Sequence, residues 1–154
     1  TTLSTLRELG RRALFVREQK MRLNAEMRPL IRAVAPSLLE IRGVGFDVAA
    51  KLLIAAGDNP HRIRSEAAWA HLCGVAPIPA SSGKVQRHRL NRGGNRQANS
   101  ALYRIVLTRM SNDERTKTYV AKRTAEGKTI GEIARILKRY VAREVYPHLP
   151  AAMT

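Results

Sequence analysis

The hydrophobic and polar positions of this chain follow the period of an α-helix over most of its length. Residues 3 to 34 have a loose apolar stripe, and the other faces are rich in charged side chains. This pattern predicts one long amphipathic helix. Pro29 should kink it or end its first part, because proline removes a backbone hydrogen bond. Thr5 and Glu8 have capping-box spacing. The stripe comprises Leu3, Leu6, Leu9 or Gly10, Ala13 or Leu14, Val16, Met21, Leu23, Met27, Leu30, Ile31 and Val34.

An apolar stripe of this length needs a covering surface. The helix can pack on its own domain, or it can pair with another chain as a coiled coil. We therefore expect residues 1–35 to form a helical linker or coiled-coil arm, and the protein to be a homo-oligomer through it.

The next region reads as a short helix, a glycine turn and a second helix. Ser37 and Glu40 have capping-box spacing. The turn Gly43-Val44-Gly45 permits positive φ and leaves backbone N–H groups bare at the next helix N-terminus, where a phosphate can bind. Residues from about 38 to 56 resemble the helix-hairpin-helix of sequence-independent DNA binders. A plain corner between two helices is the alternative.

Prolines divide the middle of the chain from the helices around it. Ser65 is placed to cap a helix that runs to about Leu72. Residues 74–79 should be extended, because the prolines exclude helix. Residues 84–92 can form a short ribbon or an open loop.

Three more helices are predicted in the C-terminal half. The first runs from about Arg96 to Met110, after a cap at Gly93-Gly94-Asn95. The second begins at the capping-box spacing of Ser111 and Glu114 and runs to about Ala125, shortly before Gly127. The third begins at the capping-box spacing of Thr129 and Glu132 and runs to about Val145. The fold class is therefore mostly α.

The charge balance favours a polyanionic partner. The 154 residues include 28 Lys and Arg against 12 Asp and Glu, a net charge of +16. Such an excess indicates a nucleic acid first and an anionic membrane surface second. No apolar run approaches the roughly 20 residues of a membrane span, and no signal peptide pattern is present. We expect a cytoplasmic protein without a membrane partner.

The residues that bind metals in proteins are not clustered in this sequence. Its four histidines lack ligand spacing, and its carboxylates are scattered along the chain. The single Cys73 allows no internal disulfide, which fits a reducing compartment, and we expect it to be a buried small hydrophobe. Aromatic residues are only 5% of the chain, which weakens the case for base stacking on single strands.

The candidate chemistry lies in residues 79–96, a Ser-Gly turn and basic loop. Ser81 and Ser82 precede Gly83, and residues 67 to 112 contain no carboxylate. A serine needs a base or a cation to act as a nucleophile, and basic side chains can hold a scissile phosphate. By spacing alone, an ordinary loop is the better explanation of the serines. The candidate phosphate-contacting residues are Lys84, Arg87, Arg89, Arg92 and Arg96, with Gly43 and Gly45 of the turn.

Several short motifs occur together in one order. They are Gly43-Val44-Gly45, Leu72-Cys73-Gly74-Val75-Ala76-Pro77, Ser81-Ser82-Gly83-Lys84, Arg89-Leu90-Asn91-Arg92-Gly93-Gly94-Asn95-Arg96 and Ala101-Leu102-Tyr103. Over roughly 38 to 146, the chain resembles the C-terminal domain of the DEDD-type insertion-sequence transposases, whose members include bridge-RNA-guided recombinases. The resemblance makes residues 36–150 this transposase domain.

The resemblance also implies a function. In that family an N-terminal RuvC-like domain supplies four acidic residues that bind Mg²⁺, and the C-terminal domain supplies a serine that attacks a DNA phosphate. The serine maps onto Ser82, with Ser81 as the alternative. A RuvC-like domain is missing here, which implies an excised domain or a truncated gene. It should bind DNA or guide RNA but be inactive alone. The alternative is a non-catalytic DNA- or RNA-binding module.

Binding of duplex DNA should be electrostatic and weakly sequence-specific. Neutralisation of about five phosphates predicts that log K falls against log salt with a slope of about −4 to −5. Titration of duplex binding at several salt concentrations measures this slope. A flat dependence contradicts the electrostatic interpretation.

Overall fold

The computed structural model describes residues 2–57, 63–80 and 88–150, and within them the fold is mostly α, as predicted. The α-helices are α1 (Thr2–Val34), α2 (Phe46–Ala56), α3 (Glu66–Leu72), α4 (Arg96–Asn112), α5 (Glu114–Ala125) and α6 (Ile130–Val145). Short 3-10 helices are η1 (Pro36–Glu40) and η3 (Tyr146–His148). The strands β1 (Ile78–Pro79) and β2 (His88–Arg89) pair antiparallel.

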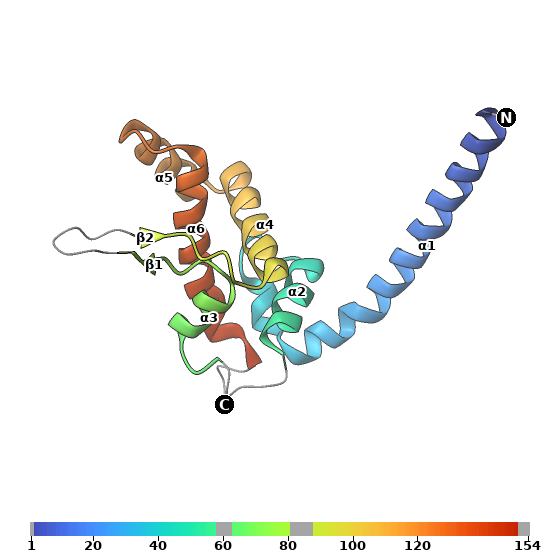
Figure 1. Ribbon diagram of the computed structural model, residues 1–154. Coiled ribbons are helices and arrows are strands. Elements are labelled where there is room, and N and C mark those ends of the chain that lie inside the picture. The colour runs from blue at the N-terminus through green and yellow to red at the C-terminus, as the bar shows by residue number, and fades with distance from the viewer. Residues whose placement is uncertain (1, 58–62, 81–87, 151–154) are drawn as a thin grey trace.

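Helix α4 is the centre of the body. It packs against α2 on one side and α6 on the other, and α3 packs against α6 (Figure 1). The side chains of Leu102 and Ile105 are fully buried on α4. They share one apolar core with Leu52 of α2, Trp69 of α3 and Val145 of α6. This core fixes the helices that surround the predicted site.

Helix α1 projects away from this body (Figure 1). Among its described residues only Ile31 is buried, and the apolar stripe toward the N-terminus is exposed, as at Leu14 with 67% exposure. Its last turns are held by the body, where the guanidinium groups of Arg28 and Arg32 lie 5.3 and 5.1 Å from the ring centre of Phe46. Pro29 lies inside the helix and does not end it.

Three predicted helix caps are present. The side chains of Ser65, Asn95 and Thr129 accept hydrogen bonds from the first turns of α3, α4 and α6. Thr129 forms the complete capping box with Glu132, and hydrogen bonds from Thr129 hold the pKa of the Glu132 carboxyl below its usual value.

The capping box predicted at Ser111 is wrong. Helix α4 continues to Asn112, and the Ser111 hydroxyl donates to the Leu107 carbonyl instead. Asp113 caps α5, because its carboxylate accepts hydrogen bonds from the backbone and hydroxyl of Thr116. These bonds, followed by the charge of Arg42, lower the Asp113 pKa. A carboxylate two residues later therefore replaces the serine.

Two other predicted caps are also wrong. The N-cap of η1 is Ala35, with no side-chain cap, so Ser37 and Glu40 form no capping box at its start. Thr5 lies inside α1, which begins at Thr2.

Cys73 is fully buried in the core, as expected from its neighbours. Burial raises the pKa of its thiol to about 12. Of the helices in the described part of the chain, none combines the length and the apolar character that crossing a bilayer requires.

Candidate nucleic-acid interface

A short ribbon flanks the segment that contains the two serines. Ile78 pairs with Arg89, and Pro79 pairs with His88, so a ribbon of two residue pairs joins the segment predicted to be extended to residues 88–89. The prediction had placed a ribbon or an open loop within residues 84–92 alone. Residues 81–87 connect the strands and lie outside the described residues. The predicted site residues in that segment are Ser81, Ser82, Lys84 and Arg87.

Two glycine backbones cross at the base of this ribbon. Gly74 has a φ of 67°, and a Cβ added at Gly94 would lie less than 3.0 Å from the Gly74 N and Cα atoms. We call this contact the glycine crossing. Next to it, the Asn95 N–H donates to the Leu72 carbonyl at 2.6 Å. The crossing therefore joins the end of α3 to the start of α4.

Asparagine side chains reinforce the glycine crossing. The Asn91 side-chain amide donates to the His71 carbonyl at 3.0 Å, and that of Asn99 donates to the Cys73 carbonyl at 2.8 Å. The Asn91 oxygen also accepts from the Gly93 N–H. In the sequence, residues 89–96 stood out mainly as a basic segment, and their structural role was not predicted. The adjacent Gly93 and Gly94, between Asn91 and Asn95, are the sequence feature that could have indicated this role.

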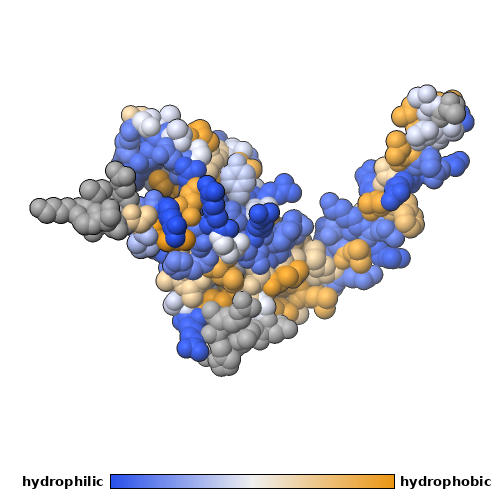
Figure 2. Space-filling model, in the orientation of Figure 1, coloured by the Kyte–Doolittle hydropathy of each residue, from blue (hydrophilic) through white to orange (hydrophobic). Residues whose placement is uncertain are grey.

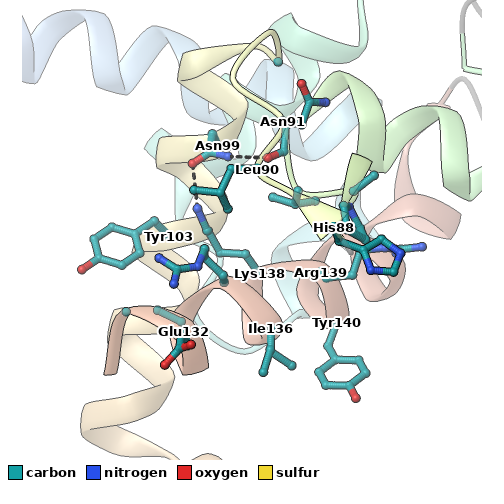
Figure 3. Close-up of a pocket in the computed structure, with 18 of the residues that line it drawn as sticks. His88, Leu90, Asn91, Asn99, Tyr103, Glu132, Ile136, Lys138, Arg139 and Tyr140 are labelled. Atoms are coloured by element: carbon teal, nitrogen blue, oxygen red, sulfur yellow. Dashed lines mark hydrogen bonds between the residues drawn. The ribbon is translucent and has the colours of Figure 1, made fainter. Parts of the chain in front are cut away.

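A groove of about 1060 Å³ lies beside the ribbon, between α4 and α6 (Figure 3). We call this cavity the groove. Of the predicted site residues, Arg89, Arg92 and Arg96 line it, so the fold brings these three together. Helix α6 and the residues before it contribute further cations to the groove, which were not among the predicted site residues. These are Lys128, Arg135, Lys138 and Arg139.

Few negative charges oppose these cations. Glu66 forms a bidentate ion pair with Arg139, with Nη2 and Oε2 2.8 Å apart. Glu132, the carboxylate among the lining residues, accepts from Thr129 as part of the α6 cap. No ion pair within the described ranges involves Arg92 or Arg135. The groove therefore has uncompensated positive charge, which attracts anions.

Lys138 lies inside the groove. Its ammonium group donates to the Asn99 side-chain oxygen at 2.9 Å and lies 5.9 Å from the ring centre of Tyr103 (Figure 3). Partial burial, followed by the nearby charge of Arg135, lowers the Lys138 pKa. A phosphate bound in the groove would raise the Lys138 pKa again, because its negative charge stabilises the charged ammonium group.

The predicted phosphate seat at the glycine turn has a different geometry. Gly43 has a φ of 88°, and a Cβ there would lie 3.2 Å from Ile105 Cγ2, so the turn packs closely on α4. Gly45 has a φ of −100°, so of the two glycines only Gly43 adopts the positive φ that the turn permits. Asp47 adds a negative charge to the first turn of α2. Helix-hairpin-helix binding of DNA stays a prediction.

Metal-ligating residues do not gather in the part of the chain that the structure describes. Across residues 2–57, 63–80 and 88–150, no group of three or more His, Cys, Asp or Glu side chains could hold a metal ion.

The helical domain with its basic groove falls into the class of insertion-sequence transposases. Residues 35–121 match the family model described as "Transposase IS116/IS110/IS902 family". The chain belongs to this family. It is 35% identical over 117 residues to the "Insertion element IS110 uncharacterized 43.6 kDa protein" of Streptomyces coelicolor. That alignment covers 74% of this chain and 29% of the relative. The family resemblance seen in the sequence is confirmed at this level.

The glycine crossing predicts a large difference between two adjacent glycines. Gly94→Ala should destabilise the domain by about 1–3 kcal/mol or more, because the methyl group would overlap the Gly74 backbone. Gly93→Ala is the matched control, since the nearest atom to its Cβ is Asn91 Oδ1 at 3.6 Å. It should change stability by about 0.5 kcal/mol or less. Urea denaturation measures both. Equal effects would show that the two backbones do not cross as described.

Proposed function

We propose that this chain is the transposase domain that supplies a serine nucleophile for cleavage and exchange of DNA strands. Ser82 is the nucleophile, and Ser81 is the alternative. DNA phosphates contact the basic residues of the groove and of the segment before it. The contacting residues are Lys84, Arg87, Arg89, Arg92 and Arg96.

The arrangement of the ribbon beside the groove carries this proposal. The chain enters the serine segment from Pro79 and leaves it at His88, and these two residues are paired. Arg89 and Arg92 follow at once and line the groove. The glycine crossing holds both ends of this path against α3 and α4. The two residues that flank the serine segment are thus held beside a basic groove.

The proposed reaction is a transfer of one phosphodiester bond. The serine Oγ attacks the phosphorus and loses its proton to a base. The bond from phosphorus to the leaving sugar oxygen breaks, and that oxygen takes up a proton. The products are a phosphoserine link and a free DNA hydroxyl. Guanidinium groups suit this step, because they stabilise charge on the phosphoryl oxygens in the transition state.

Magnesium belongs to another part of a complete transposase in this proposal. The resemblance implies a RuvC-like acidic domain, and the described residues here offer no cluster to replace it. This chain alone should therefore bind DNA without forming an adduct. A guide RNA is a further proposed partner, since the resemblance includes bridge-RNA-guided members.

The second candidate is a binding module without catalysis. The basic groove favours it equally, because uncompensated cations bind DNA or RNA phosphates whether or not a serine reacts. A covalent intermediate separates the two candidates.

The test uses a complete transposase that contains this domain, with any guide that it requires. Wild-type protein should give a protein–DNA band that resists denaturant. Ser82→Ala should abolish this band but change DNA affinity only a few fold, because one neutral hydrogen bond contributes about 0.5–1.5 kcal/mol.

Ser81→Ala is the matched control and should retain the covalent band. The reverse pattern moves the assignment to Ser81. A band that persists in the double variant excludes the serine mechanism and leaves the binding module.

We also propose that α1 pairs with α1 of a second copy as a coiled coil. Apolar residues spaced alternately three and four positions apart lie on one face of α1. Lys20 is the one polar residue in this series. This heptad spacing is typical of coiled coils. Most of the face is exposed in the monomer, as at Leu9 and Leu23. Its members are Leu6, Leu9, Ala13, Val16, Lys20, Leu23, Met27, Leu30 and Val34.

Charged substitutions on this heptad face should dissociate the oligomer. Leu9→Glu with Leu23→Glu should reduce the mass measured by light scattering to that of the monomer. Leu14→Glu is the matched control, because Leu14 is equally exposed but lies off the heptad face, and it should keep the oligomer. A monomeric wild-type chain contradicts the pairing.

A further inference from the structure

Exposed apolar side chains gather at the groove. Outside α1, few large apolar side chains are exposed among the described residues. Ile54 of α2 is one of them and does not line the groove, whereas all the others do. They are Leu90, Tyr103, Leu107, Ile130 and Tyr140. A surface that only attracts phosphates needs no such residues.

Two tyrosines provide exposed ring surface at this groove. Tyr103 of α4 is 43% exposed, and Tyr140 of α6 is 49% exposed. Figure 3 shows them well apart, with Lys138 between them in that view. The low aromatic content of the whole chain predicted little base stacking. The fold concentrates two of its four tyrosines at one basic groove instead.

Cations alternate with these apolar surfaces. The Lys138 ammonium is placed near the Tyr103 ring, and the charge of Arg135 acts on Lys138. Arg92, which follows the ribbon, and Arg96, at the start of α4, line the same groove. Aromatic platforms interleaved with a basic path are typical of sites for single-stranded nucleic acid, where bases stack and phosphates are neutralised.

We infer that the groove binds an unpaired segment of a DNA strand, with a base stacked on Tyr103 and adjacent phosphates held by Lys138 and Arg135. A cavity of about 1060 Å³ is at the upper end of pockets for one small ligand, so it suits an extended one. A duplex fits less well, because its base faces are already stacked and cannot use the tyrosines or Leu107.

The choice of DNA rests on the proposed function. The groove adjoins the ribbon, whose two strands flank the segment that contains Ser81 and Ser82. Strand exchange requires unpaired DNA at some stage, and the groove offers it a binding site.

The experiment measures binding of the present chain to a labelled 12-nucleotide DNA strand, the corresponding duplex and the same sequence as RNA, by fluorescence anisotropy. Tyr103→Ala should weaken single-strand binding by about 5- to 100-fold, because stacking contributes about 1–3 kcal/mol per base. Duplex affinity should change less than about twofold, since it depends on phosphate contacts.

Three variants serve as controls. Tyr103→Phe keeps the ring and should retain single-strand affinity within about twofold. Ile54→Ala removes a more exposed apolar side chain away from the groove and should have no effect. Arg135→Gln should make the single-strand salt slope shallower by about 0.7, the loss of one phosphate contact. Thermal melting checks that each variant is folded.

If Tyr103→Ala fails to fold, photo-cross-linking of the wild-type chain tests the same inference. Single strands with 5-iodouracil, irradiated with the wild-type chain, should cross-link to groove residues, with Tyr103 among them by peptide mass mapping.

The inference is overturned if Tyr103→Ala leaves single-strand affinity unchanged, if it weakens duplex binding equally, if RNA binds more tightly than DNA, or if cross-links fall outside the groove. Ser82 does not enter this assay. A failed covalent adduct and a failed Tyr103 dependence are therefore separate results.

Discussion

The close crossing of the Gly74 and Gly94 backbones is the constraint on which the site depends. No side chain fits between them. The crossing therefore requires glycine at position 94. It also brings the end of α3 within hydrogen-bonding distance of the start of α4. The chain between them, including the ribbon and the serine segment, leaves and returns at one point.

Helix α4 transmits this constraint to the rest of the domain. Its N-terminus meets the crossing through Asn95 and Asn99, and its buried face holds α2 and α6. Its exposed face contributes Tyr103 and Leu107 to the groove. Arg109 near its other end pairs with Glu144 of α6 and donates to the Arg42 carbonyl. Internal ion pairs use several of the few carboxylates in this way. Hydrophilic residues cover much of the visible face of the body (Figure 2).

Local patterns predicted the helices well, because helix periodicity and capping depend on residues close in sequence. The caps at Asn95 and Thr129 and the stop at Gly127 are examples. The Ser111 cap failed, because Asp113 competes for the same turn and its carboxylate is the stronger acceptor. Pro29 did not end α1, since a single proline can be accommodated within a long helix.

The candidate site was predicted only in part. Arg89, Arg92 and Arg96 form a visible run in the sequence, and they do meet at the groove. Lys128, Arg135 and Lys138 were not selected, because only the packing of α6 against α4 brings them there. The same packing places Tyr103 and Tyr140 at the groove, which composition could not reveal. At the Gly43–Gly45 turn, Gly43 packs closely against Ile105, and phosphate binding there stays a prediction.

The central claim is that nucleic acid lies in the groove between α4, α6 and the ribbon. Hydrogen–deuterium exchange of the chain, with and without a DNA strand, tests this claim directly. Slower amide exchange on binding is expected in residues 88–96 and 128–140. Protection at the glycine turn without protection along the groove would contradict this claim.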